Sequence, residues 1–159
     1  MPAPAHLVSA LMLENQVDGK TYGAEIACNW RPVKWWSLKT AYSYLQMDLD
    51  VDNSGENAST GGIGMNKSPH HQVSLRSMLE LRENLELDSW LRYVDSLPDI
   101  NVGSYVTLDI RLGWNPFKKF EVSLVGQNLL ENQHSEFTEM GFSPREIERS
   151  FYGKITWRF

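Results

Sequence analysis

The chain carries few residues whose type and spacing could do chemistry, and the first group is acidic. In the stretch DLDVDNSGE, Asp48, Asp50 and Asp52 stand at alternate positions, as carboxylates do in calcium-binding loops. Such a loop also needs glycine at its sixth position and glutamate at its twelfth, where this chain has Asn53 and Ser59. We therefore predict a solvated acidic loop here, with a weak calcium site as the alternative.

Histidines form the second group. His70 and His71 lie beside one long polar stretch, and His134 lies in another. Neutral imidazole can ligate a metal or touch a metal chelate, but a solvated loop explains these positions as well. Ser74 follows His71 closely, yet nothing in the sequence supplies the third partner or the oxyanion hole of a hydrolase. The sequence thus predicts no enzyme activity and no cofactor, and it leaves the histidines as weak metal candidates.

Length and composition narrow the class of protein. The chain has 159 residues and a formal charge of -5, which is enough for one domain and argues against a nucleic-acid partner. Cys28 is the single cysteine, so no internal disulfide can form. No apolar run reaches the ~18 residues of a transmembrane helix. The first residues lack the basic start and the small-residue cleavage site of a signal peptide.

The hydrophobic pattern has a period of two residues and nowhere a long period of 3.6. In YVTLDIRLGW, for example, Leu108 and Ile110 fall on one face and Asp109 and Arg111 on the other. Such alternation is typical of a strand with one apolar and one polar face. The predicted strands cover residues 7–15, 22–30, 36–45, 73–82, 85–95, 105–114, 120–128 and 150–159.

The last of these segments alternates most regularly and ends on an aromatic residue. Phe151, Ile155, Trp157 and Phe159 share its apolar face, and Lys154 lies on the opposite face. Chain ends usually fray and carry little structural information. A well-specified strand at the very end of this sequence therefore calls for a specific reason.

The joins between the predicted strands alternate in length. RPVKW, RENLE and NPFKK are tight turns, whereas residues 49–69, about 96–103 and about 131–147 form longer polar joins. Antiparallel strands with short turns at one end and long loops at the other describe an up-and-down sheet. We predict an all-β antiparallel meander of about eight strands, forming a single domain over residues 1–159 as a transmembrane β-barrel or a segment of one.

Large aromatic residues favour a membrane setting for this sheet. They gather at strand ends beside the short turns, as expected of an aromatic girdle at one interface of a bilayer. The girdle is predicted to comprise Trp30, Trp35, Trp36, Trp114, Phe117 and Phe120.

The polar face carries charges of both signs. A membrane barrel would turn them into a wet lumen, whereas a small soluble barrel would turn them to the outside, so the charges alone do not discriminate between the two. The predicted lumen-facing charges are Arg76, Glu80, Asp88, Arg92, Asp109, Arg111 and Lys154.

Four sequence stretches together resemble the C-terminal part of the barrel of a TonB-dependent outer-membrane receptor. They are TYGAEIACNWRPVKWWSLKTAYSYL (a hairpin with a proline-containing turn), SPHHQVSLR (re-entry after a long loop), LVGQNLLENQHSEF (the penultimate strand) and ERSFYGKITWRF (the final strand). The usual acidic residue after Asn-Leu in the third stretch is aspartate, and here it is Glu131. The resemblance covers essentially the whole sequence.

The resemblance implies a 22-stranded barrel plugged by an N-terminal domain in the bacterial outer membrane. Such a receptor takes up a scarce nutrient, such as an iron–siderophore or a cobalamin-like compound, when TonB acts on the plug. Eight strands, with no plug and no TonB motif, then form a fragment that is not transport-competent alone. The implied partners are outer-membrane lipid, the missing barrel strands and plug, TonB through that plug, a small-molecule nutrient, and the barrel-assembly machinery, whose signal is the terminal strand that ends at Phe159.

Two alternatives stay open at this point. One is a complete eight-stranded outer-membrane barrel with a structural or adhesive role and a packed polar interior. The other is a soluble eight-stranded carrier of a small apolar ligand, which would need an apolar cavity. A coding sequence of several hundred residues upstream would favour the receptor, and solubility without detergent would favour the carrier.

Arginine on the apolar face tests the predicted contact with lipid. Replacing Leu108 or Ile110 with arginine is expected to block membrane insertion, at a cost of about 2–4 kcal/mol near the bilayer midplane. Folding into lipid vesicles, followed by protease protection, measures the effect. Normal insertion of either variant would contradict the outward orientation of this face.

Overall fold

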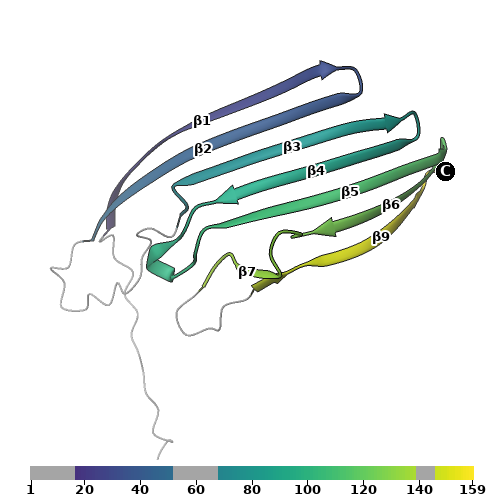
Figure 1. Cartoon of the computed structure of the whole chain (residues 1–159). Coiled ribbons are helices and arrows are strands. Elements are labelled where there is room, and N and C mark those ends of the chain that lie inside the picture. The colour runs from purple at the N-terminus through teal and green to yellow at the C-terminus, as the bar shows by residue number, and fades with distance from the viewer. Residues whose placement is uncertain (1–16, 52–67, 139–145) are drawn as a thin grey trace, which may run out of the picture.

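A computed structural model describes residues 17–51, 68–138 and 146–159 of the chain as an antiparallel sheet (Figure 1). Its strands, in spatial order, are β1 (Val17–Val33), β2 (Trp36–Val51), β3 (His71–Arg82), β4 (Leu85–Val94), β5 (Tyr105–Phe117), β6 (Phe120–Gln127) and β9 (Ser150–Trp157). Neighbours in this sheet also follow one another in sequence, which confirms the predicted up-and-down meander. The predicted strand over residues 7–15 lies outside the described residues.

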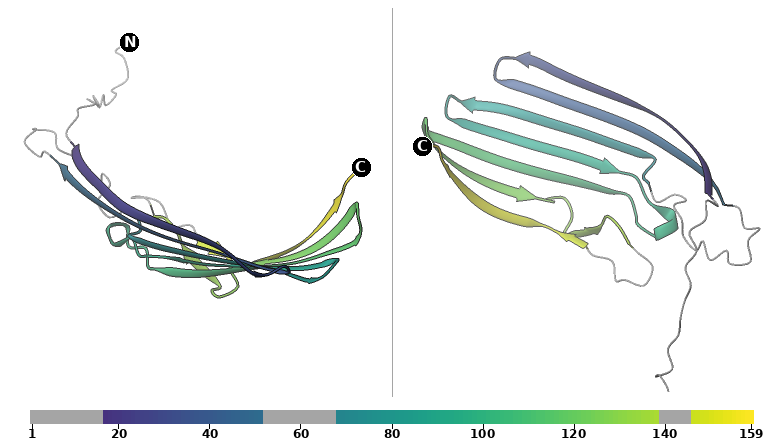
Figure 2. Two further views of the ribbon diagram at one scale, coloured as in Figure 1. Left: turned by 90° about the horizontal axis from the view of Figure 1, so that it is seen from above. Right: turned by 180° about the vertical axis from the view of Figure 1, so that it is seen from behind.

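The sheet is one curved layer, and it is not closed. Seen from above, its strands form an arc (Figure 2, left), and β1 and β9 are the two edges of the described sheet. Only Leu97 and Val102 are buried apolar side chains among the described residues, while Ile26 and Ile155 are 70% and 69% exposed. The described strands therefore enclose no apolar cavity of the kind that a soluble carrier needs.

Short turns lie at one end of the sheet and long connections at the other (Figure 1). The hairpins β1–β2, β3–β4 and β5–β6 each contain a register irregularity close to the turn, between Trp30 and Val33, between Glu80 and Arg82, and between Trp114 and Phe117. An extra residue at such a bulge increases the local right-handed twist of the strands. The rim at the short turns is thus more strongly twisted than a regular ladder would be.

The long connections contain short elements that the sequence pattern did not predict. After β4 comes the 3₁₀ turn η1 (Pro98–Ile100), held by two backbone hydrogen bonds between Leu97 and Val102. After β6, the short strands β7 (Gln133–Ser135) and β8 (Glu146–Glu148) pair with each other. Within the described ranges, no helix is long and apolar enough to cross a membrane.

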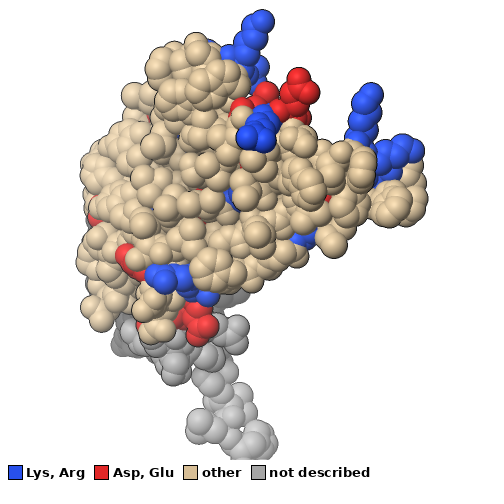
Figure 3. Space-filling view, turned by 45° about the vertical axis from the view of Figure 1, so that its right-hand side comes forward, with Lys and Arg blue, Asp and Glu red and all other residues tan. Residues whose placement is uncertain are grey.

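The register assigns each side chain to one of the two faces. Leu91 opposes Leu108 and Leu112 opposes Leu124, and the same face continues to the edge strand β9. Charged residues alternate with these positions, so they lie on the other face of the sheet. On the face viewed in Figure 3, charged side chains are sparse and lie mostly toward the margins, and uncharged atoms cover most of the area.

Two glycines on this sheet provide a matched test of how closely the strands approach. A Cβ on Gly23 would lie 2.3 Å from the backbone oxygen of Tyr44, whereas at Gly153 the nearest atom, the oxygen of Ser123, is 3.9 Å away. Gly23→Ala should therefore force β1 away from β2 and cost about 1–3 kcal/mol. Gly153→Ala should leave stability within about 1 kcal/mol of the parent. Thermal unfolding in detergent micelles measures both, and equal melting temperatures would refute the close approach.

Candidate functional site

The charged face of the sheet is the candidate site, because its polar side chains form connected networks. The β-ladder register places all of the predicted lumen-facing charges on this one face, distributed over β3, β4, β5 and β9: Arg76, Glu80, Asp88, Arg92, Asp109, Arg111 and Lys154. Side chains near the middle of this face are packed closely: Thr107 and Ser123 are 2% and 3% exposed, whereas Leu124 and Ile155 on the apolar face are 64% and 69% exposed. Side chains converge on the inner side of a curved sheet, so the charged face is the concave one.

Arg111 is the centre of the first network. Its Nη1 donates to Asp88 Oδ2 at 3.1 Å and to Glu86 Oε2 at 3.3 Å, and its Nη2 donates to Glu121. Glu121 also accepts from Arg158 Nη2 at 3.4 Å, so the network joins β4, β5, β6 and the end of the chain. Charge-assisted hydrogen bonds of this kind are about twice as strong as neutral ones. The network therefore links β4, β5, β6 and the C-terminal residues of the chain, which are neighbours in the sheet.

Gly113 leaves room for this arrangement. A Cβ on Gly113 would lie 2.6 Å from Arg111 Nη2, so the guanidinium group passes directly over the glycine. Any larger side chain at this position would displace the arginine from its carboxylates. The glycine in the middle of β5 thus serves the packing of a neighbouring side chain, which is a common use of glycine inside a strand.

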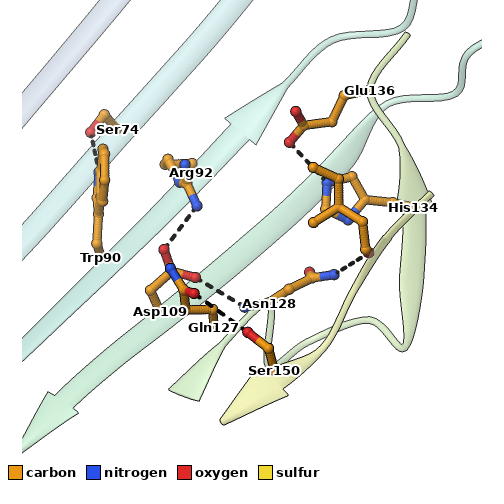
Figure 4. A network of polar contacts seen from close by, with 10 residues as sticks. Ser74, Trp90, Arg92, Asp109, Gln127, Asn128, His134, Glu136 and Ser150 are labelled. Atoms are coloured by element: carbon orange, nitrogen blue, oxygen red, sulfur yellow. Dashed lines mark hydrogen bonds and ion pairs between the residues drawn. The ribbon is translucent and has the colours of Figure 1, made fainter. Parts of the chain in front are cut away.

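Asp109 is the centre of the second network (Figure 4). Its carboxylate accepts from Arg92 Nη2 at 2.9 Å and from the backbone N–H of Asn128 at 3.0 Å. Asn128 has a positive φ of 53° and donates its side-chain amide to the carbonyl of Ile147 at 2.9 Å. Asparagine tolerates this left-handed conformation better than most residues. The Asp109 carboxylate thus connects β4 and β5 to the segment that follows β6. Asn128 connects that segment to β8.

His134 lies under this segment and is buried, being only 7% exposed. Its ring stacks on Tyr105 with 4.3 Å between the ring centroids, and its Nε2 lies 3.3 Å from Glu136 Oε1. The expectation of a solvated loop histidine is therefore wrong for His134. A sequence pattern could not reveal this burial, because the contact with Tyr105 depends on how β7 folds back over β5.

The other metal candidates within the described residues do not come together with His134. His71 Nδ1 is hydrogen-bonded to the hydroxyl of Tyr42 at 2.9 Å on the apolar face, and Asp48 accepts from the side chain of Gln46 at 3.1 Å. Asp52 and the side chain of Asp50 lie outside the described residues. Among the described residues, no group of three or more His, Cys, Asp and Glu side chains is arranged to hold a metal ion.

Trp90 is the residue on this face that the sequence reasoning did not single out. Its indole N–H donates to Ser74 Oγ at 2.8 Å, and the Arg92 Cζ lies 4.3 Å from the ring centroid. The Arg76 Cζ lies 6.0 Å from the same centroid. The signal was present, because Trp90 alternates in phase with Asp88 and Arg92 and not with the leucines of β4.

Aromatic side chains form two bands on the apolar face. Near the short turns lie Trp30, Trp36, Trp114, Phe120 and Trp157, and toward the other end lie Tyr22, Tyr42, Tyr44 and Tyr93. Trp35 and Phe117 adjoin the short turns, Phe151 and Ile155 share the apolar face of β9, and Phe159 follows that strand. Trp30 lies eight positions after Tyr22 on β1, which is about 26 Å along a strand. At the ~45° tilt of barrel strands this is about 19 Å along the barrel axis, somewhat less than the ~25 Å apolar band between the two aromatic girdles of a membrane barrel.

Comparison with solved structures gives the same architecture. The chain superimposes on a chain of the FpvAI–pyocin S2 complex (TM-score 0.69, 15% identity), with 89% of this chain and 19% of that chain covered. The ferric-catecholate import receptor Fiu from K12 E. coli gives a TM-score of 0.69 at 18% identity, with 89% and 21% covered. The siderophore receptor PiuA from Acinetobacter baumannii gives 0.68 at 21% identity, with 87% and 22% covered. This chain thus spans about one fifth of the length of each structure.

Sequence comparison identifies the family. Among curated proteins, none matches this chain. The family model described as "TonB dependent receptor-like, beta-barrel" matches residues 8–129, which is more than half of the sequence. The match includes the first six strands of the described sheet, β1 to β6, and the structural likeness covers 89% of the chain. The chain therefore belongs to the family of TonB-dependent receptor-like β-barrels.

Proposed function

We propose that this chain forms part of the barrel wall of an outer-membrane receptor that takes up a scarce nutrient, such as an iron–siderophore or a cobalamin-like compound. The observation that carries the proposal is the two-faced single-layer sheet in a chain of this family. The apolar face, with its two aromatic bands, contacts lipid. The concave face, with its networks of charged side chains, borders an aqueous lumen.

This part of the barrel wall contributes to binding the nutrient and to its passage through the membrane. No catalytic step is assigned to it. Energy for transport comes from TonB acting on a plug domain that lies in another part of the receptor. The remaining strands of the barrel pair with the edges β1 and β9, since unpaired backbone groups cannot face lipid. The barrel-assembly machinery recognises the terminal strand, whose apolar face carries Phe151, Ile155 and Trp157 and which is followed by Phe159.

The two ends of the sheet have different roles in this proposal. The short turns lie on the periplasmic side, and the long connections lie at the cell surface, where cargo arrives. Through Asn128, Asp109 fixes the start of one such connection and its return at Ile147. Tyr105 and His134 pack inside this connection. A surface loop anchored to the wall in this way can present a defined shape to a ligand.

Uptake in cells tests the function. A full receptor gene that includes the coding sequence of this chain, expressed in an iron-starved Gram-negative strain without its own siderophore receptors, should restore uptake of radiolabelled iron from at least one member of a siderophore panel. Uptake should disappear when the strain also lacks TonB, because the plug is then not moved. Cobalamin uptake is measured in parallel. Equal uptake with and without TonB, or no uptake from either ligand class, would argue against the receptor.

The single native cysteine tests the orientation of the two faces. Cys28 lies on the apolar face of β1 between Ile26 and Trp30, and the adjacent Ala27 lies on the concave face. In outer membranes, Cys28 should react with a lipid-soluble maleimide and resist a charged, membrane-impermeant one. In the matched variant C28S/A27C, the charged reagent should react instead, because the side chain now faces water. The reverse pattern would invert the assignment of lipid and lumen.

A further inference from the structure

Charged residues are distributed unevenly between the two ends of the sheet. At the end with the long connections, the described charged residues are mostly acidic, as at Asp48, Asp95 and Glu131. At the end with the short turns, Glu83 is acidic, but cations predominate: Arg31, Lys34, Arg82, Lys118, Lys119 and Arg158. A surface that carries an excess of one charge attracts partners of the opposite charge.

The cations of the β1–β2 hairpin are partly compensated. Arg31 and Lys34 line a hollow together with three carboxylates, those of Glu80, Glu86 and Asp88. Carboxylates in the same hollow offset part of the positive charge. This hairpin is therefore not the place on the rim that would bind a further anion most strongly.

The β5–β6 turn differs, because both of its residues are lysines. Lys118 and Lys119 are exposed, and neither forms an ion pair with a described residue. The Glu121 side chain, two positions further along the chain, is only 15% exposed and is already paired with Arg111 and Arg158. Two adjacent like charges repel each other, and a bound anion would reduce this repulsion.

Backbone hydrogen bonds hold this turn between its neighbours, next to the C-terminal end of the chain (Figure 1). The N–H of Arg158 donates to the carbonyl of Lys119 at 2.8 Å, and the N–H of Asn115 donates to the carbonyl of Asn84 in the β3–β4 turn at 2.8 Å. The backbone of the turn is thus fixed at one height on the sheet, which limits where the two ammonium groups can reach.

Exposed aromatic rings flank the two lysines. Phe117 and Trp157 are 73% and 66% exposed, and Phe120, which pairs with both in the ladder, packs edge-on against Trp157 at 5.9 Å between ring centroids. Such rings favour the headgroup level of a bilayer, and a lysine stem can extend along apolar surface while its ammonium group stays in water. The rings therefore place Lys118 and Lys119 at the level of lipid phosphates.

We propose that Lys118 and Lys119 bind the phosphate of an anionic phospholipid, whose acyl chains pack against Phe117 and Trp157. A phospholipid fits the site better than a free phosphate, because two cations adjoin an exposed apolar surface. An anionic lipid fits better than a zwitterionic one, because its headgroup carries no cation to offset the phosphate. The inference rests on the proposed function in one respect, since the apolar face must contact lipid.

A photo-reactive side chain locates the lipid. The full receptor that includes this chain, with p-benzoylphenylalanine in place of Phe117, is reconstituted in phosphatidylethanolamine vesicles that contain a minor share of phosphatidylglycerol, and is irradiated. Mass spectrometry should find phosphatidylglycerol crosslinked well above its share in the vesicles. The same replacement at Trp30, an exposed ring of the same aromatic band, is the control and should report the bulk composition. Bulk composition at both positions would overturn the inference.

Variants test the two halves of the site. In the receptor, K118Q/K119Q should weaken phosphatidylglycerol binding about 30-fold, as measured by native mass spectrometry in detergent. Phe117→Ser keeps both lysines and should also weaken binding, because the acyl chains lose an apolar contact. R31Q/K34Q removes the same charge from the same rim and should bind within about threefold of the parent. An equal loss in R31Q/K34Q and K118Q/K119Q would mean general attraction to a basic rim and would contradict a defined site.

Two further ligands test the choice of occupant. Phosphatidylcholine has the same phosphate and acyl chains but no net charge, and it should bind more weakly than phosphatidylglycerol. Glycerophosphoglycerol has the anionic headgroup without acyl chains, and it should compete poorly. If either ligand binds as tightly as phosphatidylglycerol, the assignment of an anionic phospholipid is wrong.

The crosslinking result also separates this inference from the proposed function. If the probes at Phe117 and Trp30 both crosslink lipid without preference, the apolar face contacts the bilayer as proposed, and the anionic lipid site alone is wrong. If neither probe crosslinks lipid, the assignment of the apolar face to the membrane fails, and the lipid site fails with it.

Discussion

Backbone hydrogen bonding between adjacent strands is the interaction on which the rest of this structure depends. The described sheet is a single layer with almost no buried apolar side chains, so packing of a core contributes little to it. Each strand from β2 to β6 has its backbone paired on both sides along much of its length, which satisfies the polar groups that a bilayer cannot solvate. The ladder fixes the register, and the register in turn decides which side chains lie on the apolar face and which meet one another on the charged face.

The side-chain contacts differ between the two faces of the sheet. On the convex face, apolar side chains stay exposed within one layer, and in the proposed receptor lipid takes the place of the hydrophobic core of a soluble protein. On the concave face, half-buried carboxylates and guanidinium groups neutralise one another across β4, β5 and β6, with Arg111 and Asp109 at the two centres. The polar networks therefore hold neighbouring strands together on the concave face.

The sequence predicted the parts of this arrangement that depend on local periodicity. Alternation through Leu108, Ile110 and their neighbours identified strands, faces and short turns, because side-chain direction in a strand has a fixed period of two. Contacts that depend on tertiary folding could not be predicted. The strands β7 and β8 are too short to show a period in the sequence, and the burial of His134 depends on where they lie. Trp90 shares the period of Asp88 and Arg92, but periodicity alone cannot reveal its hydrogen bond to Ser74 or its contact with the Arg92 guanidinium.

Unequal strand lengths give the wall an uneven height. β1 and β2 contain 17 and 16 residues, whereas β6 and β9 contain 8 each. At about 3.3 Å per residue and a tilt near 45°, the longer pair rises about 40 Å along the barrel axis, well beyond a ~25 Å apolar band. In the proposed receptor, the first hairpin therefore extends further beyond the apolar band than the strands near the chain terminus do. A ligand that diffuses toward the membrane would then reach this part of the rim first.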